Sequence, residues 1–277
     1  MRSLHLPILP TLFALLFVAC ATTETQTVSD ETKGDSYYQL GIAAFVKGDT
    51  VKAKLQITKA IEQAPLVPYY HNHLGLVYLQ EKDFDRAQTC FEAAHKLDES
   101  YSDALNNLGL LYLMKNDIPK AKEYFLRTIA DQLYPYPHFA ETNLGRALRM
   151  EKNYVEAEQH IQRAIRLKGT HCDAYKELAM LYDEQGMNEK AVENYKKTIQ
   201  YCPGHVEALY RGAVKLLVLK DTALGTAWLK TCLEMERENT ASIEIPFLRE
   251  CANLARQYGV TLGKDTGDPR QQIDGGY

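Results

Sequence analysis

The chain has 277 residues, of which 45% are hydrophobic and 25% are charged, and its formal net charge is −4. This composition is typical of a folded protein and excludes a low-complexity or highly charged disordered chain. The sequence contains no basic run, so neither a nucleic-acid backbone nor an anionic bilayer surface is an obvious electrostatic partner. We therefore expect no nucleic acid among the partners.

Residues 1–19 are predicted to be a signal peptide. Arg2 supplies the positive start, and the apolar stretch over residues 4–18 is interrupted by Pro7 and Pro10. Such a stretch is too short and too poorly flanked to cross a membrane as a helix. We expect these residues to be removed.

Residues 17–20, Phe-Val-Ala-Cys, resemble a lipobox, although Phe17 stands where leucine is usual. A signal peptidase would then cut before Cys20, whose thiol would carry the lipid. Ala21, by analogy with the bacterial sorting rule, favours the outer membrane, with the protein facing the periplasm; exposure on the cell surface stays open. The alternative is an ordinary secretory signal with a coincidental cysteine.

Residues 20–33 are predicted to form a lipidated flexible tether, because they are rich in Thr, Glu, Asp and Ser and nearly devoid of apolar side chains. Removal of residues 1–19 takes away Arg2 and no acidic residue, so the net charge of the mature chain becomes −5. A tether of this length keeps the folded part close to the membrane.

One pattern is then written twice with a spacing of 34 residues. Its first half reads Leu-Gly-x-x-Tyr and its second half Ala-x-x-x-Phe. The pattern resembles the tetratricopeptide repeat, a helix-turn-helix unit. In that arrangement the glycine allows two helices to approach closely, while the aromatic residues fill the space between layers. The two copies are Leu74, Gly75, Tyr78, Ala87 and Phe91, then Leu108, Gly109, Tyr112, Ala121 and Phe125.

Extending this register predicts an all-α, right-handed superhelical solenoid of six tetratricopeptide repeats over residues 34–239, with the sixth repeat degenerate. A capping helix is expected within residues 240–258, and residues 259–277 are expected to form a flexible tail. One continuous array is the simplest domain organisation. The expected repeats are residues 34–67, 68–101, 102–136, 138–171, 172–205 and 206–239.

The period is broken by two extra residues between repeats three and four, where Tyr134-Pro135-Tyr136-Pro137 predicts an early helix end and a stiff elbow. A tolerated loop insertion explains the same residues. Together with the lipobox and six repeats, however, Tyr136-Pro137-x-x-Ala140 leading into Asn143-Leu144-Gly145 resembles the type IV pilus assembly lipoproteins of the PilF, PilW and Tgl type. The six-repeat members of that family are pilotins.

This resemblance implies a non-enzymatic outer-membrane lipoprotein that binds a secretin subunit and promotes its localisation and oligomerisation. Two alternatives remain open on the sequence. One is a repeat lipoprotein that scaffolds peptidoglycan enzymes, which would call for fewer repeats. The other is an accessory subunit of an outer-membrane protein assembly machine, which would favour longer helices and fewer, more divergent repeats.

No catalytic, cofactor or metal site is expected, and no small-molecule substrate. His71 and His73 lie two residues apart, so on a helix they point in nearly opposite directions and cannot share a metal ion. The sequence has no zincin spacing of histidines, no Gly-x-Ser-x-Gly and no glycine-rich phosphate loop.

Five cysteines follow Cys20 in a compartment that permits disulfides. Cys172 opens helix A of repeat five and Cys202 closes its helix B, so the hairpin brings both to one end. Cys232 is expected to face Cys251 on the capping helix. Buried free thiols are the alternative for both pairs.

The candidate partner site is the concave face formed by the A helices of repeats one to three, which is unusually apolar. We expect its asparagines to bond to the backbone of a partner segment. The alternative is that some of these residues pack against the neighbouring repeat or the tether. The predicted groove residues are Tyr38, Ile42, Phe45, Tyr69, Asn72, Leu76, Leu79, Asn106, Leu110, Leu113 and Met114.

In repeats four and five the corresponding residues are mostly charged, with both signs present, and are expected to form an ordinary solvated surface. They are Arg146, Arg149, Met150, Lys176, Met180, Asp183 and Glu184.

Overall fold

The computed structural model describes residues 30–238 and 245–262. Over these ranges the chain is all-α, with thirteen helices and no strand, as expected. The predicted signal peptide, the predicted lipid attachment site Cys20 and most of the predicted tether lie outside the described residues, as does most of the predicted tail. No helix in the described ranges combines the length and the apolar character needed to cross a bilayer.

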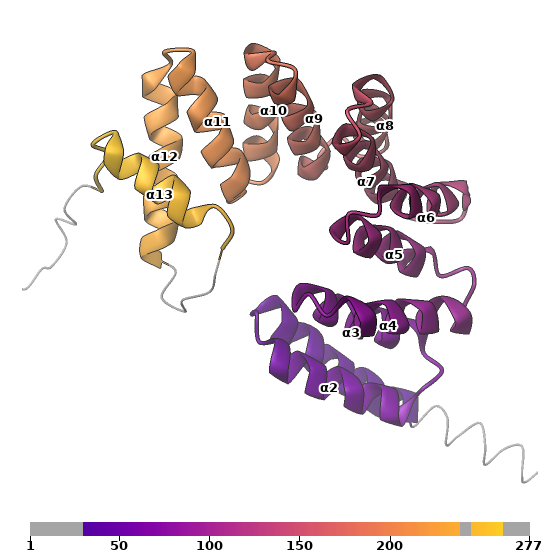
Figure 1. The fold of residues 1–277 in the computed structure, drawn as a ribbon. Coiled ribbons are helices and arrows are strands. Elements are labelled where there is room, and N and C mark those ends of the chain that lie inside the picture. The colour runs from indigo at the N-terminus through magenta and orange to yellow at the C-terminus, as the bar shows by residue number, and fades with distance from the viewer. Residues whose placement is uncertain (1–29, 239–244, 263–277) are drawn as a thin grey trace, which may run out of the picture. The chain divides into compact units, whose positions relative to one another are not determined.

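The helices form six consecutive helix-turn-helix pairs followed by one further helix (Figure 1), which confirms the predicted repeats. We call the first helix of each pair A and the second B. The first helix A covers residues 30–46 and so includes residues 30–33, which were expected to belong to the tether. The remaining helices are α2 (Thr50–Gln63), α3 (Pro68–Gln80), α4 (Phe84–Leu97), α5 (Ser102–Met114), α6 (Ile118–Ala130), α7 (Pro137–Met150), α8 (Tyr154–Leu167), α9 (Cys172–Glu184), α10 (Asn188–Tyr201), α11 (Val206–Val218), α12 (Thr222–Glu238) and α13 (Leu248–Gln257).

The turn between the two helices of a pair is itself repeated. Asp83 and Asp117 cap the B helices α4 and α6, each accepting a hydrogen bond from a backbone N–H in the first turn. The residue before each aspartate, Lys82 or Asn116, has a positive φ of 59° or 61°. The left-handed residue ends helix A and the aspartate starts helix B, so the chain reverses within a few residues.

The glycine of each pattern faces the aromatic residue of its own repeat. A Cβ atom at Gly75 would lie 2.6 Å from Cε1 of Phe91, and Gly109 meets Phe125 in the same way. Both phenylalanines are fully buried. The close approach of helices A and B therefore depends on the missing side chain, as the repeat pattern indicates.

The described residues cluster into two compact units, which divide between Tyr134 and Pro135. This division falls at the predicted elbow, whereas one continuous array was expected. Helix α6 stops after thirteen residues, one fewer than α4 or α8, and Pro137 occupies the first turn of α7. Since proline fixes its own φ and restricts the residue before it, the junction cannot continue a helix.

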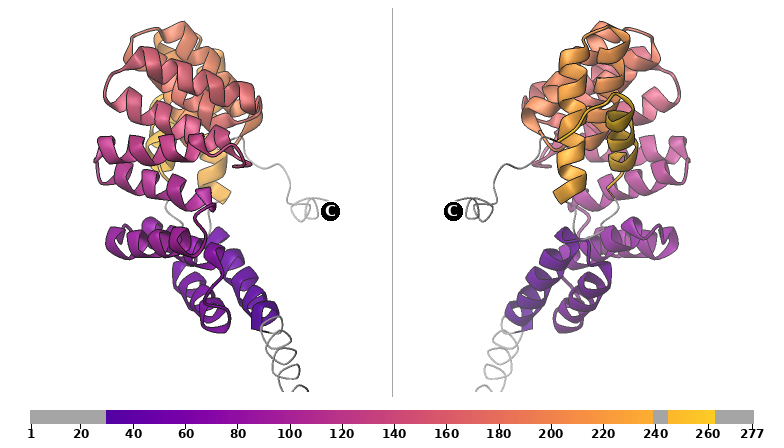
Figure 2. Two further views of the ribbon diagram at one scale, coloured as in Figure 1. Left: turned by 90° about the vertical axis from the view of Figure 1, so that its right-hand side faces the viewer. Right: turned by 90° about the vertical axis from the view of Figure 1, so that its left-hand side faces the viewer.

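Unit 2, from Pro135 onward, ends with α13, which packs against α11 and α12 (Figure 2). Cys251 of α13 is bonded to Cys232 of α12. The helix begins at Leu248, eight residues after the start of the range 240–258 in which a capping helix was expected. Phe247, immediately before it, has a left-handed φ of 64°, so helical geometry cannot run back through that position.

Candidate partner-binding site

The predicted groove residues lie on the A helices of unit 1, and neighbouring A helices contact one another directly. Tyr38 on the first helix stacks edge-on against Tyr69 of α3 at 5.1 Å between ring centroids. Its hydroxyl also lies 3.2 Å from Nδ1 of His73. The structure therefore brings repeats one to three together side by side, as the sequence predicts.

Four of the eleven predicted groove residues are nevertheless buried. The exposed fraction is 8% for Leu79, 7% for Leu113, 2% for Asn72 and 7% for Asn106. These four belong to the core of the unit, which corrects the prediction that they line an open groove.

Helical geometry explains this burial. Leu79 and Leu113 lie four residues after Gly75 and Gly109, the glycines that face helix B. Residues separated by three or four positions share a helix face, so both leucines point toward the B helix and the neighbouring repeat. The asparagines lie three residues before the same glycines and follow the same rule.

Asn72 has its hydrogen bonds inside unit 1. Its Oδ1 accepts a bond from Nδ2 of Asn107 at 2.9 Å, and its own Nδ2 donates to the hydroxyl of Tyr101 at 3.3 Å. Because Asn72 is buried, the remaining N–H and oxygen lone pair of its amide are not accessible to the backbone of a partner. The role expected for Asn72 is therefore wrong.

Tyr69 and Tyr70 are tied to Asp35, one turn into the described part of the first helix. Their hydroxyls donate to Oδ1 of Asp35 at 2.6 and 2.7 Å. These two bonds lower the pKa of Asp35. Burial raises the pKa of neighbouring Tyr38 to about 12, so its hydroxyl remains protonated near neutral pH. The tyrosines thus form an ordered, hydrogen-bonded part of the A-helix face.

The rest of the predicted groove is accessible. Met114 is 49% exposed, and the other members are partly exposed. Leu76 and Leu110 directly follow the glycines, about 100° around the helix from the direction of helix B. We call this set the exposed strip; it consists of Tyr38, Ile42, Phe45, Tyr69, Leu76, Leu110 and Met114.

Two of the charged A-helix residues that were expected on a solvated surface of unit 2, Arg149 and Lys176, are buried, whereas Glu184 is exposed as expected. Glu177 is only 1% exposed and Arg149 only 7%. Nη2 of Arg149 lies 3.0 Å from Oε2 of Glu177, and Nε of Arg146 lies 2.7 Å from Oε1 of Glu177. The ammonium of buried Lys176 is 3.1 Å from Oε1 of Glu177. Glu177 is thus enclosed by three cations.

Burial by itself raises the pKa of Glu177, but Arg146, Lys176 and Arg149 together outweigh this effect and lower the pKa to about 2. The network continues outward, since Arg149 also pairs with Glu184 and Lys215 lies 2.5 Å from Asp183. These charged side chains of unit 2 therefore form ion pairs with one another. Sequence reasoning missed Glu177, whose place in repeat five between Lys176 and Leu178 gave no sign of burial.

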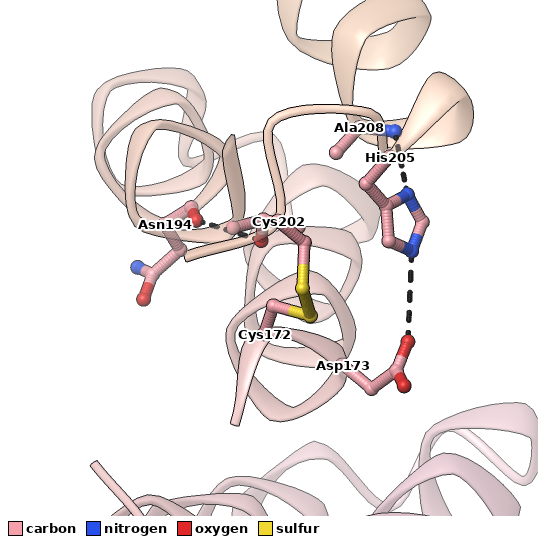
Figure 3. The surroundings of a disulfide bond; sticks show 7 residues. Cys172, Asp173, Asn194, Cys202, His205 and Ala208 are labelled. Atoms are coloured by element: carbon pink, nitrogen blue, oxygen red, sulfur yellow. Dashed lines mark hydrogen bonds and ion pairs between the residues drawn. A yellow bond between two sulfur atoms is a disulfide. The ribbon is translucent and has the colours of Figure 1, made fainter. Parts of the chain in front are cut away.

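Both expected cysteine pairs are bonded in the structure. Figure 3 shows Cys172 at the start of α9 joined to Cys202 at the end of α10, with a Cα–Cα distance of 6.0 Å. Beside this bridge, His205 accepts a hydrogen bond from the backbone N–H of Ala208 and lies 3.5 Å from Asp173. The disulfide bond and the contact between His205 and Asp173 together tie α9 to the segment that enters α11.

Cys90 is the free cysteine of the described residues, and burial raises the pKa of its thiol to about 11. A thiol with so high a pKa is a poor nucleophile at neutral pH. Within the described ranges, no three His, Cys, Asp or Glu side chains are placed to hold a metal ion.

Comparison with known proteins agrees with this architecture. Models of the tetratricopeptide repeat match residues 38–87, 67–132 and 173–205. The type IV pilus assembly protein PilF of Pseudomonas aeruginosa is 27% identical over 180 residues, which cover 63% of this chain and 71% of PilF.

Two solved structures share the fold. The structure of PilF from Pseudomonas aeruginosa has a TM-score of 0.60 at 23% identity, with 81% of this chain and 99% of that chain covered. For PilW, described as a widely conserved type IV pilus biogenesis factor, the TM-score is 0.61 at 21% identity, with 79% and 98% covered.

The repeats also resemble those of an enzyme. The UDP-N-acetylglucosamine–peptide N-acetylglucosaminyltransferase of Giardia intestinalis is 28% identical over 169 residues, which cover 60% of this chain but only 11% of that protein. Tetratricopeptide arrays are scaffolds typical of protein–protein binding. The paired helices, the glycine–phenylalanine contacts and the matched models together identify the fold of this chain as an array of tetratricopeptide repeats, a fold that the solved structures of PilF and PilW share.

Proposed function

We propose that this chain is a non-enzymatic outer-membrane lipoprotein that acts as a pilotin. It binds the secretin subunit of a type IV pilus machine and promotes the localisation and oligomerisation of that subunit. The lipid on Cys20 holds the protein at the periplasmic face of the outer membrane.

The observation that carries this proposal is the extent of the similarity to PilF and PilW. The repeats of this chain superpose on 99% and 98% of those two chains. By contrast, the similarity to the Giardia transferase involves a small fraction of that protein. Both solved chains consist almost wholly of the same array of repeats. This supports a function that the array itself carries out, without a further domain.

The exposed strip of unit 1 is the surface we assign to the secretin. Its residues are apolar or aromatic and project from adjacent A helices, so an amphipathic helix or an extended peptide of the partner would meet them in succession. Hydrophobic contact of this kind makes binding only weakly dependent on salt.

A chromosomal deletion tests the proposal. We expect a strain without the protein to lose secretin multimers from its outer-membrane fraction and to regain them with the wild-type gene. The Cys20→Ser chain should keep its fold but leave secretin monomers away from the outer membrane. Normal secretin multimers in the deletion strain would refute the pilotin role.

A further inference from the structure

The outer edge of repeat one is left uncovered. Leu40 is 53% exposed, although the leucines at the same position of the next four repeats are 2–8% exposed. In repeats two, three and five the B helix of the preceding repeat packs against this A helix, and no described pair precedes repeat one. The four buried equivalents are Leu74, Leu108, Leu144 and Leu178.

Lysines surround Leu40 on the same edge. Lys33 lies seven residues before Leu40, which places both on one face of the first helix, and Lys47 follows directly in the turn after that helix. Tyr37 lies three residues before Leu40, on the same face of the first helix. The ammonium of Lys59 on α2 lies 5.7 Å from the centroid of the Tyr37 ring.

Lys52 lies seven residues before Lys59, on the same face of α2. The two helices therefore present a common patch, which we call the basic edge; it consists of Lys33, Tyr37, Leu40, Lys47, Lys52 and Lys59.

The positive charge of this edge is largely uncompensated. Lys47, Lys52 and Lys59 form no ion pair with any described residue, and the ammonium of Lys33 lies 4.0 Å from Asp30. Among the other carboxylates close to these lysines in the sequence, Asp49 accepts the backbone N–H of Lys52 as the cap of α2, and Asp35 accepts from Tyr69 and Tyr70. Glu31 and Glu62 are exposed. Lysines so far apart in the chain form no basic run, which is why the sequence showed no such patch.

We propose that the basic edge rests on a bilayer surface that contains anionic phospholipids. The lysines face the lipid phosphates, and Leu40 and Tyr37 enter the interface between headgroups and acyl chains. This inference rests on the lipid anchor of the proposed function. Cys20 lies ten residues before residue 30, and ten extended residues span at most about 35 Å, so the anchored edge stays within reach of the membrane.

A bilayer fits the edge better than a second copy of the chain. A two-fold dimer through this edge would place its lysines against the same lysines of the partner, which is unfavourable. A stable protein interface also uses about 20–30 residues on each side, with a largely uncharged centre. An anionic surface instead attracts each lysine.

The first test uses the full chain with Cys20→Ser, which removes the anchor, and vesicles of phosphatidylethanolamine and phosphatidylglycerol. We expect weak, salt-sensitive binding that Lys47→Gln with Lys52→Gln reduces about 30-fold, because each lysine near an anionic surface contributes roughly a fivefold factor. Lys196→Gln with Lys197→Gln, an exposed pair on α10, is the matched control and should change binding little.

The second test uses the lipidated protein with Leu40→Trp in vesicles that contain brominated phospholipids. The wild-type chain has a single tryptophan, Trp228, which is buried in unit 2 and provides the baseline. We expect the added tryptophan to be quenched strongly and Trp228 little.

The outcomes separate the two proposals. If the lipidated chain does not float with vesicles, the anchor of the proposed function fails. If it floats but the added tryptophan is not quenched, or if both lysine pairs affect vesicle binding equally, the basic edge does not contact lipid. A Leu40-dependent dimer in sedimentation, with no quenching, would assign the edge to a second copy and overturn the inference.

Discussion

Arg149 and Glu177 form a buried ion pair in unit 2, with 3.0 Å between Nη2 of the arginine and Oε2 of the glutamate. The two residues come from different A helices, α7 and α9. Replacing only one member of such a pair leaves the other charge buried without compensation, which costs more than the pair contributes. The pair therefore makes the packing of repeat four on repeat five sensitive to a single substitution.

We expect Glu177→Gln to lower the free energy of unfolding by about 3–5 kcal/mol. The substitution keeps the shape of the side chain but leaves Arg149 and Lys176 without their shared carboxylate. Urea unfolding followed by the fluorescence of Trp228, which lies in the same unit, measures the change. Glu193→Gln on the exposed side of α10 is the control. A loss below about 1 kcal/mol, the range of surface pairs, would contradict this account.

Gly109→Ala should destabilise unit 1 by about 1–3 kcal/mol, because its methyl group would overlap the buried ring of Phe125. Gly169→Ala is a suitable comparison, since its Cβ would come no closer than 4.0 Å to another atom. Thermal unfolding followed by circular dichroism compares the two. Equal melting temperatures would show that helices A and B do not need their close approach.

Acid should weaken unit 2 through His138 and His171, whose rings lie 4.9 Å apart. Burial, with repulsion from His171 and Lys168, lowers the pKa of His138 from 6.5 to about 4, and burial also lowers the pKa of His171. Between these values the unfolded chain binds more protons than the folded one, so stability falls as the pH drops from about 6.5 to about 4.

Urea midpoints measured across this pH range test the histidine prediction. The wild-type chain should lose stability toward acid, and His138→Phe should flatten that part of the profile. An unchanged slope in the variant would assign the acid sensitivity to other groups.

The bridge between Cys232 and Cys251 should hold α13 on α12. Cys251→Ser is expected to cost about 2–4 kcal/mol and to speed amide hydrogen exchange in α13. Cys90→Ser, which breaks no bridge, is the control. Alkylation of the unfolded, non-reduced protein should modify Cys90 alone among the five cysteines after Cys20. Labelling of Cys232 or Cys251 in that experiment would mean that the bridge is absent.

Periodicity in the sequence was sufficient to predict the repeats because each contact recurs locally. Gly75 and Phe91, for example, lie sixteen residues apart in one hairpin, so their spacing alone indicates that they meet. The same reasoning placed Cys172 beside Cys202. The late start of α13 was not predictable, because it depends on the left-handed backbone of Phe247.

Contacts between repeats were harder to foresee. Leu76 and Leu79 look alike in the sequence, but Leu76 lies about 100° around the helix from Gly75 and Leu79 only about 40°. Leu79 is therefore buried, whereas Leu76 is partly exposed. Glu177 and Glu184 likewise lie on one helix, and burial of the first depends on cations from α7. Composition cannot distinguish a solvated charge from one enclosed by an adjacent repeat.

The exposed strip provides the sharpest test of the proposed function. Met114 and Leu110 can be changed with little effect on the core because the first is exposed and the second partly exposed. Leu126 and Leu133 in the same unit are 52% and 90% exposed and lie outside the strip, so they allow a matched pair of changes.

The measurement is the affinity of the purified protein for the purified secretin subunit. We predict that Leu110→Asp with Met114→Asp weakens binding at least about 30-fold, as loss of a hot spot does, while helicity and melting stay near wild type. Leu126→Asp with Leu133→Asp should bind normally. Unchanged affinity for the strip variant, or an equal loss in both variants, would contradict the claim that unit 1 binds the secretin through this strip.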